Sequence, residues 1–231
     1  QAGEVIDEIR SLSRQHDSHL VSGMAFMDPD SGRYYNSLIL FGEIDDMYHK
    51  RHLVPFGEYL PFDKYLRPLL GFLDIPMSSF SRGEQENPVL VVAGEVIGVS
   101  ICYEDVFGEE VIDALPQASM LANVSNDAWF GDSLAPHQHL QMARMRAMET
   151  GRYMIRATNT GISAIIDQKG KILDQLPQFG AHALSARVVP FEGSTPYSRT
   201  GNLFIIGLMV ALLGLCMSRQ KHNVNGKTAA Q

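Results

Sequence analysis

The chain has 231 residues, of which 45% are hydrophobic and 19% are charged. This length and composition allow a full hydrophobic core and exclude both a disulfide-stapled miniprotein and a wholly disordered chain. Its 19 Lys and Arg residues against 26 Asp and Glu residues give a formal net charge of -7, which leaves no broad basic surface for nucleic acid. The two cysteines, Cys102 and Cys216, cannot form a disulfide framework, so any role of Cys102 is that of a single thiol.

Hydrophobic periodicity predicts alternating helices and strands along most of the chain. Turn residues at 28–32, 94–95 and 168–170 predict three hairpins. Because strands and helices follow one another in mixed order, the sequence predicts a layered α/β domain. The expected elements are helices over 5–15, 108–115 and 136–151 and strands over 20–26, 37–41, 89–93, 96–102, 120–125, 153–158, 162–167 and 171–176.

The end of the chain predicts a membrane-spanning helix. Residues 200–218, TGNLFIIGLMVALLGLCMS, carry no charge and lie between Arg199 and Arg219. A helix of this length spans about 28 Å, close to the ~30 Å hydrocarbon thickness of a bilayer. A buried core helix is the alternative, but such a helix normally has a polar edge. The basic tail, residues 219–231, is then expected in the cytoplasm, with residues 1–199 outside it.

Cys102 lies where a reactive side chain is expected. It ends an apolar strand, it is followed directly by Tyr103 and Glu104, and a helix is predicted to begin at Gly108. A strand-to-helix turn presents a nucleophile and leaves backbone N–H groups to bind an oxyanion. A free cysteine is also typical of a buried structural position, so this segment by itself leaves both interpretations open.

A second segment, residues 48–61, supplies polar partners for a thiol. Its sequence YHKRHLVPFGEYLP contains Lys50 and Glu58. A thiol nucleophile needs a cation that favours the thiolate and a carboxylate that takes its proton. Lys50 together with Cys102 and a glutamate therefore indicates nucleophilic catalysis, whereas a solvated basic turn is the alternative for this segment.

Longer motifs favour a nucleophilic Cys102 over a structural one. The chain resembles the nitrilase, or carbon-nitrogen hydrolase, superfamily in Y-x-K-x-H-L at 48–53, SICYED around Cys102, NVSNDAWFG at 123–131 and RMRAMETGRYMIRATNTGISA at 144–164. More narrowly, it is similar to the apolipoprotein N-acyltransferase family in KRHLVPFGEYLPF, PMSSFSRG, HQHLQMARMRAMETGR and TPYSRTGN. This resemblance implies a nitrilase-like α-β-β-α sandwich over residues 1–199, lacking its N-terminal part and followed by one transmembrane helix.

The resemblance also implies a Glu-Lys-Cys triad. Cys102 matches the nucleophile, Lys50 matches the triad lysine, and Glu58 matches a glutamate that holds Lys50 oriented and charged. Tyr103 and Glu104 match pocket residues, and the Tyr103 N–H is a candidate oxyanion donor. The triad glutamate lies farther before the lysine than this chain extends, so none is assigned. The chain is accordingly expected to be the C-terminal portion of such an enzyme and to be inactive alone.

The implied reaction is a two-step acyl transfer without a metal or an organic cofactor. Cys102 takes an acyl chain from a phospholipid as a thioester and passes it to the α-amine of a diacylglyceryl-cysteine on an apolipoprotein. The implied partners are thus a phospholipid, a diacylated apolipoprotein and a membrane, with the catalytic domain on the periplasmic side of a bacterial inner membrane.

His137 and His139 lie two residues apart on an expected helix, which separates their side chains and does not predict a zinc site.

One segment and two rival functions remain open. Residues 66–80, LRPLLGFLDIPMSSF, concentrate apolar side chains among Pro and Gly. This pattern fits a loop packed on the core and a lid that dips into lipid equally well, and our hypothesis is the lid. The first rival function is a membrane-anchored amidase of the same superfamily, in which water hydrolyses the thioester. The second is a membrane-tethered module without catalysis, in which Cys102 is structural.

Overall fold

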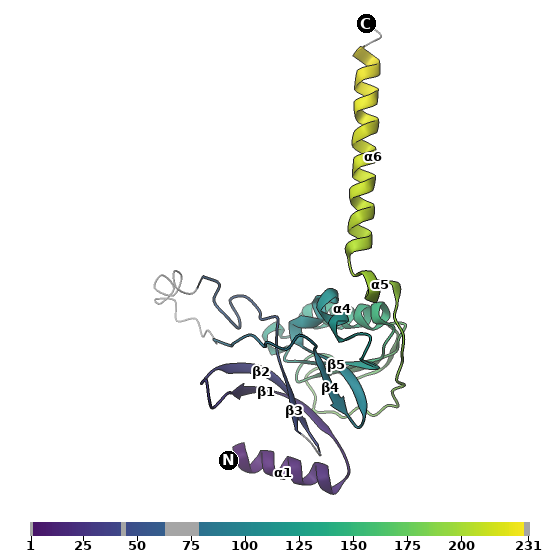
Figure 1. The fold of residues 1–231 in the computed structure, drawn as a ribbon. Coiled ribbons are helices and arrows are strands. Elements are labelled where there is room, and N and C mark those ends of the chain that lie inside the picture. Colours follow the sequence, from purple (N-terminus) through teal and green to yellow (C-terminus); the bar gives the residue numbers. More distant parts are fainter. Residues whose placement is uncertain (1, 43–44, 63–78, 229–231) are drawn as a thin grey trace.

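A computed structural model describes residues 2–42, 45–62 and 79–228 of the chain. Helix α1 (Ala2–Gln15) lies on the outer face of a three-stranded antiparallel sheet (Figure 1). Arg10 joins these two layers, because its guanidinium pairs with Asp45 at 2.7 Å and lies 5.9 Å from the centre of the Phe41 ring. The strands of the sheet are, in spatial order, β1 (Leu20–Met27), β2 (Tyr34–Phe41) and β3 (Asp46–His49).

A second sheet has six strands that follow one another in sequence order. These strands are β4 (Val89–Val92), β5 (Glu95–Ile101), β6 (Met120–Ser125), β7 (Met154–Thr158), β8 (Ala164–Ile166) and β9 (Ile172–Gln175). The helices between them are η1 (Cys102–Val106), α3 (Gly108–Val111), η2 (Ile112–Ala114), η3 (Ala128–Phe130) and α4 (Ala135–Thr150), where η marks a 3-10 helix. β5, β6 and β7 pair in parallel and the other neighbours pair antiparallel. Parallel neighbours need a crossover connection, so the helices lie between β5 and β6 and between β6 and β7.

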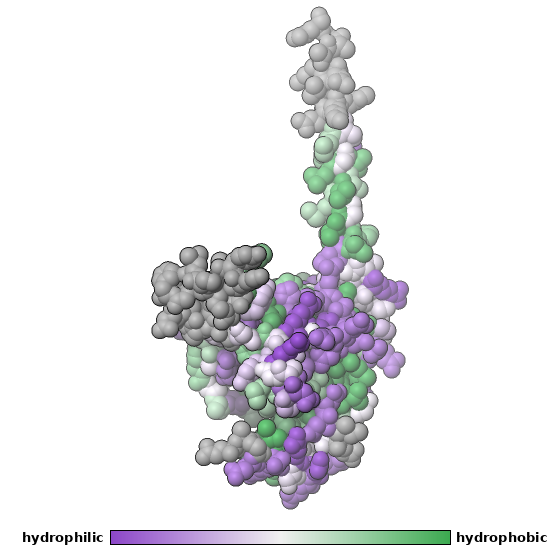
Figure 2. Space-filling model, turned by 60° about the vertical axis from the view of Figure 1, so that its left-hand side comes forward, coloured by the Kyte–Doolittle hydropathy of each residue, from purple (hydrophilic) through white to green (hydrophobic). Residues whose placement is uncertain are grey.

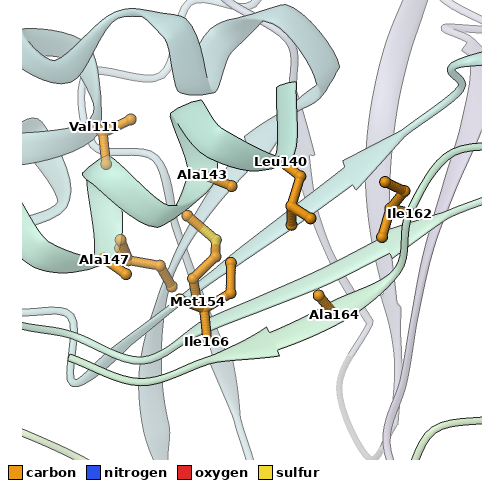
Figure 3. Packing of buried hydrophobic residues seen from close by; sticks show 9 residues of the cluster. Val111, Leu140, Ala143, Ala147, Met154, Ile162, Ala164 and Ile166 are labelled. Atoms are coloured by element: carbon orange, nitrogen blue, oxygen red, sulfur yellow. The ribbon is translucent and has the colours of Figure 1, made fainter. Parts of the chain in front are cut away.

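Two buried clusters hold the layers together. Between the sheets, Leu38 of β2 packs with Leu90 and Ile101 of the second sheet. On the other face of the second sheet, Ala143 of α4 packs against Met154 of β7, as Figure 3 shows. The layers are therefore α1, the three-stranded sheet, the six-stranded sheet and α4, which confirms the predicted α/β sandwich.

The elements follow the sequence pattern with few exceptions. The strand predicted over 120–125 is β6, and the helix predicted over 136–151 is α4, which ends at Gly151 in the left-handed conformation. The helix predicted over 108–115 is shorter than expected, because α3 ends at Val111 and a 3-10 turn follows. The strand β3 was not predicted from the sequence; it has only four residues and begins at an exposed aspartate. Residues 66–78 of the predicted lid lie outside the described residues.

The C-terminal helix stands apart from both sheets. Helix α5 (Pro196–Thr200) lies against α4, and after Gly201 the helix α6 (Leu203–Thr228) extends away from the domain (Figure 1). All described side chains over 203–219 are exposed, and Figure 2 shows the apolar surface that they form. By length and hydropathy together, none of the helices in the described part of the chain qualifies to cross a membrane. The span expected over residues 200–218 therefore stays a prediction.

Candidate active site

Cys102 lies in a constrained turn directly after β5. Its φ is 53°, in the left-handed region that residues other than glycine rarely adopt. Its thiol is free and the residue is half-buried. The Cys102 carbonyl accepts hydrogen bonds from Asn123 Nδ2 at 3.3 Å and from His139 Nε2 at 3.2 Å. The turn that presents this cysteine is thus held by side chains from β6 and α4.

Glu104, two residues later, joins this turn to the segment that contains Lys50. The carboxylate is 3% exposed and accepts four hydrogen bonds. The donors are Ile101 N at 2.7 Å, Tyr48 Oη at 2.9 Å, Arg51 N at 2.6 Å and His52 N at 3.1 Å. Burial raises the pKa of Glu104, and the backbone N–H donors partly oppose that rise. The carboxylate thus holds two backbone segments together. The pocket role that the resemblance implies for Glu104 stays a prediction.

Lys50 and Glu58 form a buried ion pair. The Lys50 side chain is 1% exposed, and its Nζ lies 2.8 Å from each carboxylate oxygen of Glu58. Glu58 also accepts hydrogen bonds from Val54 N at 2.7 Å and from the Asn36 amide. The Lys50 backbone is fixed as well, since its N–H donates to the Asn36 carbonyl at 2.8 Å. The ammonium is therefore oriented by a carboxylate that Asn36 of β2 and the backbone of Val54, in the loop after β3, hold in place.

Tyr103 belongs to a small aromatic cluster that covers the same two segments. The rings of His52 and Phe107 stack at 3.8 Å, and the Tyr103 ring meets Phe107 edge-on at 5.0 Å. His52 Nδ1 lies 2.7 Å from a carboxylate oxygen of Glu110. The five residues that the sequence singled out therefore fall into one connected region. Cys102, Tyr103 and Glu104 are consecutive, Glu104 contacts the backbone next to Lys50, and Glu58 pairs with Lys50.

A buried charged cluster that the sequence analysis missed lies beneath the Cys102 turn. It joins Asp105 of η1, Asp127, His139 of α4 and Arg156 of β7, which are at most 6% exposed. His139 lies 2.9 Å from Asp105 and 3.1 Å from Asp127. Arg156 lies 3.3 Å from Asp105 and 3.1 Å from Asp127. Each carboxylate is thus shared by the same two cationic side chains.

The charges of this cluster balance when His139 is protonated. Burial alone would lower the pKa of His139, but the hydrogen bonds to Asp105 and Asp127 raise it to about 9. Burial would likewise raise the pKa of Asp127, and His139, Ser125 and Arg156 lower it instead. Two carboxylates then face two cations, which is the condition under which buried charges are tolerated.

The sequence contained a signal for this cluster. His139 shares helical spacing with the buried Ala143 and Ala147, so its side chain had to face the core. Arg156 shares strand alternation with the buried Met154. The expectation for His139 from the sequence concerned metal binding alone. Among the described residues, no group of His, Cys, Asp and Glu is arranged to hold a metal ion.

Comparisons with known proteins agree with this architecture. The chain is 45% identical over 223 residues to the apolipoprotein N-acyltransferase of Methylococcus capsulatus and 52% identical over 206 residues to that of Nitrosomonas europaea. These alignments cover 96% and 89% of this chain but only 44% and 40% of the relatives. The chain thus spans less than half the length of the curated relatives it matches.

Solved structures and a family model define the fold group. Saccharomyces cerevisiae Nit3, a member of the nitrilase superfamily, aligns with a TM-score of 0.57 at 21% identity over 75% of this chain and 60% of its own. An amidase from Nesterenkonia sp. AN1 aligns with a TM-score of 0.54 at 22% identity over 75% of this chain and 65% of its own. Likeness at this identity establishes the fold alone. Residues 1–191 match the carbon-nitrogen hydrolase family model, and the chain therefore belongs to the carbon-nitrogen hydrolase family.

Proposed function

We propose that this chain carries the acyl-transfer site of an apolipoprotein N-acyltransferase. The observation that carries the proposal is the joining of the Cys102 turn to the buried Lys50–Glu58 pair through Glu104, in a chain 45% to 52% identical to two enzymes of that name. The donor is a phospholipid, and the acceptor is the free α-amine of a diacylglyceryl-cysteine on an apolipoprotein. The reaction needs no metal and no organic cofactor.

The first step makes a thioester on Cys102. The thiolate sulfur bonds to the carbonyl carbon of a phospholipid ester, and the tetrahedral intermediate collapses with loss of a lysophospholipid, whose oxygen takes up a proton. Lys50 and the Tyr103 N–H stabilise the oxyanion, because donors fixed in a water-poor site favour the charge that develops there.

The second step transfers the acyl group to the acceptor. The α-amine attacks the thioester carbon, the C–S bond breaks, and an amide and the free thiol are formed while the amine gives up a proton. Glu58 keeps Lys50 oriented through both steps. Glu104 keeps the Cys102 turn against the Lys50 segment. No residue of this chain is assigned as the general base, so activity is expected in a protein extended to the length of the relatives.

We also propose that residues 200–218 anchor the domain in a bacterial inner membrane. Support comes from the exposed apolar side chains along α6, such as Leu203 at 75% and Val210 at 64% exposure. Apolar area costs about 25 cal/mol per Å² in water, so a helix exposed on all sides is stabilised by lipid. The catalytic domain, residues 1–199, then lies on the periplasmic side, and the basic tail, residues 219–231, lies in the cytoplasm.

Intact mass spectrometry tests the acyl transfer. The chain, extended at its N-terminus to the length of its curated relatives, is incubated with phospholipid and no acceptor. We expect a mass gain of one acyl group that is absent in Cys102→Ala, retained in the matched control Cys216→Ala, and discharged by a diacylated lipopeptide. An adduct discharged by water alone indicates an amidase-type hydrolase instead. No adduct, with a Cys102 thiol that resists alkylation until unfolding, contradicts any catalytic role.

A further inference from the structure

The carbonyl of Cys102 is anchored in the interior by two buried side chains. Asn123 Nδ2 lies 3.3 Å and His139 Nε2 lies 3.2 Å from this oxygen. Asn123 is fully buried and His139 is 6% exposed. The two donors come from β6 and α4, elements on which the proposed reaction places no catalytic residue. A carbonyl held from two elements has a fixed direction.

This direction determines where the next backbone N–H points. A peptide bond is planar and trans, so the Cys102 carbonyl and the Tyr103 N–H point in opposite directions. With the carbonyl held inward, the Tyr103 N–H is directed away from the buried cluster. Tyr103 lies in the first turn of η1, where a helix leaves N–H groups without acceptors in the helix. The left-handed φ of 53° at Cys102 makes this arrangement dependent on outside support.

The buried charged cluster keeps His139 in position. Its Nδ1 faces Asp127, and its Nε2 is shared between Asp105 and the Cys102 carbonyl. Arg156 pairs with the other oxygen, Oδ2, of each carboxylate. Hydrogen bonds from an ionised donor are about twice as strong as neutral ones. A carbonyl that accepts such a bond is polarised, which makes the N–H of the same peptide a better donor.

We propose that His139 and Asn123 orient the peptide bond between Cys102 and Tyr103, so that its N–H is fixed as a donor to the oxyanion of acyl transfer. Both are positioning residues, because they touch the Cys102 carbonyl and not the reacting atoms. The inference rests on the proposed acyl transfer, for which it assigns the support of one oxyanion donor.

Two rates on the same thiol separate this role from a merely structural one. Acylation of Cys102 by p-nitrophenyl butyrate passes through a tetrahedral oxyanion. Alkylation by iodoacetamide needs the thiolate but forms no oxyanion. A defect in the oxyanion donor therefore lowers the acylation rate and leaves the alkylation rate unchanged, whereas a disturbed fold alters both rates.

The variants form a matched set in the chain extended to the length of its relatives. His139→Asn keeps an amide near Asp127 that is too short to reach Cys102, and His139→Gln can place its amide nitrogen near the position of Nε2. Both variants remove the same charge. We expect His139→Asn to lower acylation about 100-fold and His139→Gln to recover at least about tenfold of that loss, with alkylation within about threefold of wild type. The exposed His137 supplies the control, His137→Asn, with both rates unchanged.

The other possible results would overturn the positioning role of His139 and Asn123, the proposed function, or both. Acylation of His139→Asn at the wild-type rate, or equal losses in both rates, overturns the inference. If that variant does not fold, Asn123→Ser replaces it, with about tenfold slower acylation expected and a wild-type rate overturning the inference. Acylation of the wild-type protein by the nitrophenyl ester but not by phospholipid refutes the proposed function alone. A wild-type thiol that neither ester acylates refutes both.

Discussion

At the scale of single residues, the Lys50–Glu58 ion pair is buried, and its ammonium lies equally close to both carboxylate oxygens. Lys50 is 1% exposed, and both Glu58 oxygens lie 2.8 Å from its ammonium. The Arg33–Glu84 pair differs in both respects, because its closest atoms are 3.8 Å apart and its side chains are 57% and 87% exposed. Removing one partner of a buried pair leaves a charge without compensation, whereas an exposed charge is solvated by water.

The two glutamates therefore give a matched prediction. Glu58→Gln should lower the free energy of unfolding by about 3 kcal/mol, because Lys50 keeps a buried charge without a counterion. Glu84→Gln should lower it by less than about 1 kcal/mol. Chemical denaturation of the detergent-solubilised protein measures both values. Equal losses in the two variants would show that the Lys50 charge is compensated by other means.

Glu58→Gln should also slow the acylation of Cys102, because Lys50 loses the carboxylate that orients it toward the oxyanion. The single-turnover acylation rate of folded protein measures this effect. Glu84→Gln is expected to leave that rate unchanged, since its carboxylate is exposed and pairs with Arg33.

At the scale of elements, the Cys102 turn is a junction of four segments. Glu104 binds it to the chain after β3, Asn123 to β6 and His139 to α4, while Arg156 of β7 pairs with the carboxylates that hold His139. α4 is attached to the sheet by its apolar face, as Figure 3 shows, and also by these charges. The position of the nucleophile therefore depends on how α4 and the six-stranded sheet are joined.

This junction predicts a pH dependence of stability. The pKa of His139 is raised from 6.5 to about 9 in the folded protein. The stability that protonated His139 contributes is therefore fully present below pH 6.5 and is lost as the pH rises through about 9. The charged groups that face it are Asp105, Asp127 and Arg156. We expect the free energy of unfolding to fall by about 3 kcal/mol across this range because His139 is deprotonated.

Unfolding free energies measured at pH 6 and pH 10 test this prediction. His139→Gln should lose this part of the pH dependence, since glutamine does not titrate. His137→Gln is the control on the same helix and should keep it, because His137 is exposed. A pH profile that His139→Gln leaves unchanged from the wild type would mean that folding does not raise the pKa of His139.

At the scale of the whole molecule, the sandwich and α6 differ in where their apolar side chains lie. The domain buries two clusters of apolar side chains, whereas all the described apolar side chains of α6 are exposed (Figure 2). α5 attaches α6 to the domain on the side where α4 lies (Figure 1). A membrane around residues 200–218 would therefore lie beyond the α4 layer of the domain.

Charged substitutions at two depths test this arrangement. Leu208→Arg and Met209→Arg together place two charges near the middle of residues 200–218, at a cost of about 3 kcal/mol each in a bilayer. We expect this variant to be released from membranes by alkaline carbonate, while the unchanged chain stays with them. Ser218→Arg at the end of the segment should stay membrane-bound, because an arginine there can reach the interface. Release of all three proteins would contradict the membrane anchor.

Much of the fold could be predicted because the signals are local. The turn at 28–32 joins β1 to β2, as expected. The hairpin of β4 and β5 is also present, but its turn is at residues 93–94, one position earlier than predicted, because Glu95 already pairs with Val92. α4 begins with a proline in its first turn and ends at Gly151, both of which are helix-boundary signals. The strand β3 could not be predicted, because four residues with a polar start carry little periodicity. Its pairing with β2 places it in the sheet.

The sequence by itself determined the order of most helices and strands and pointed to Cys102, Lys50 and Glu58, because turn chemistry, periodicity and long motifs depend on residues near one another in the chain. Only the tertiary structure decided that Glu104 holds two segments together and that His139 supports the Cys102 carbonyl. The Glu104 contact with Tyr48 joins residues 56 positions apart, and the His139 contact with Cys102 joins residues 37 positions apart. Such contacts depend on how the layers pack, and the protonation of His139 depends on the charges that packing brings to it.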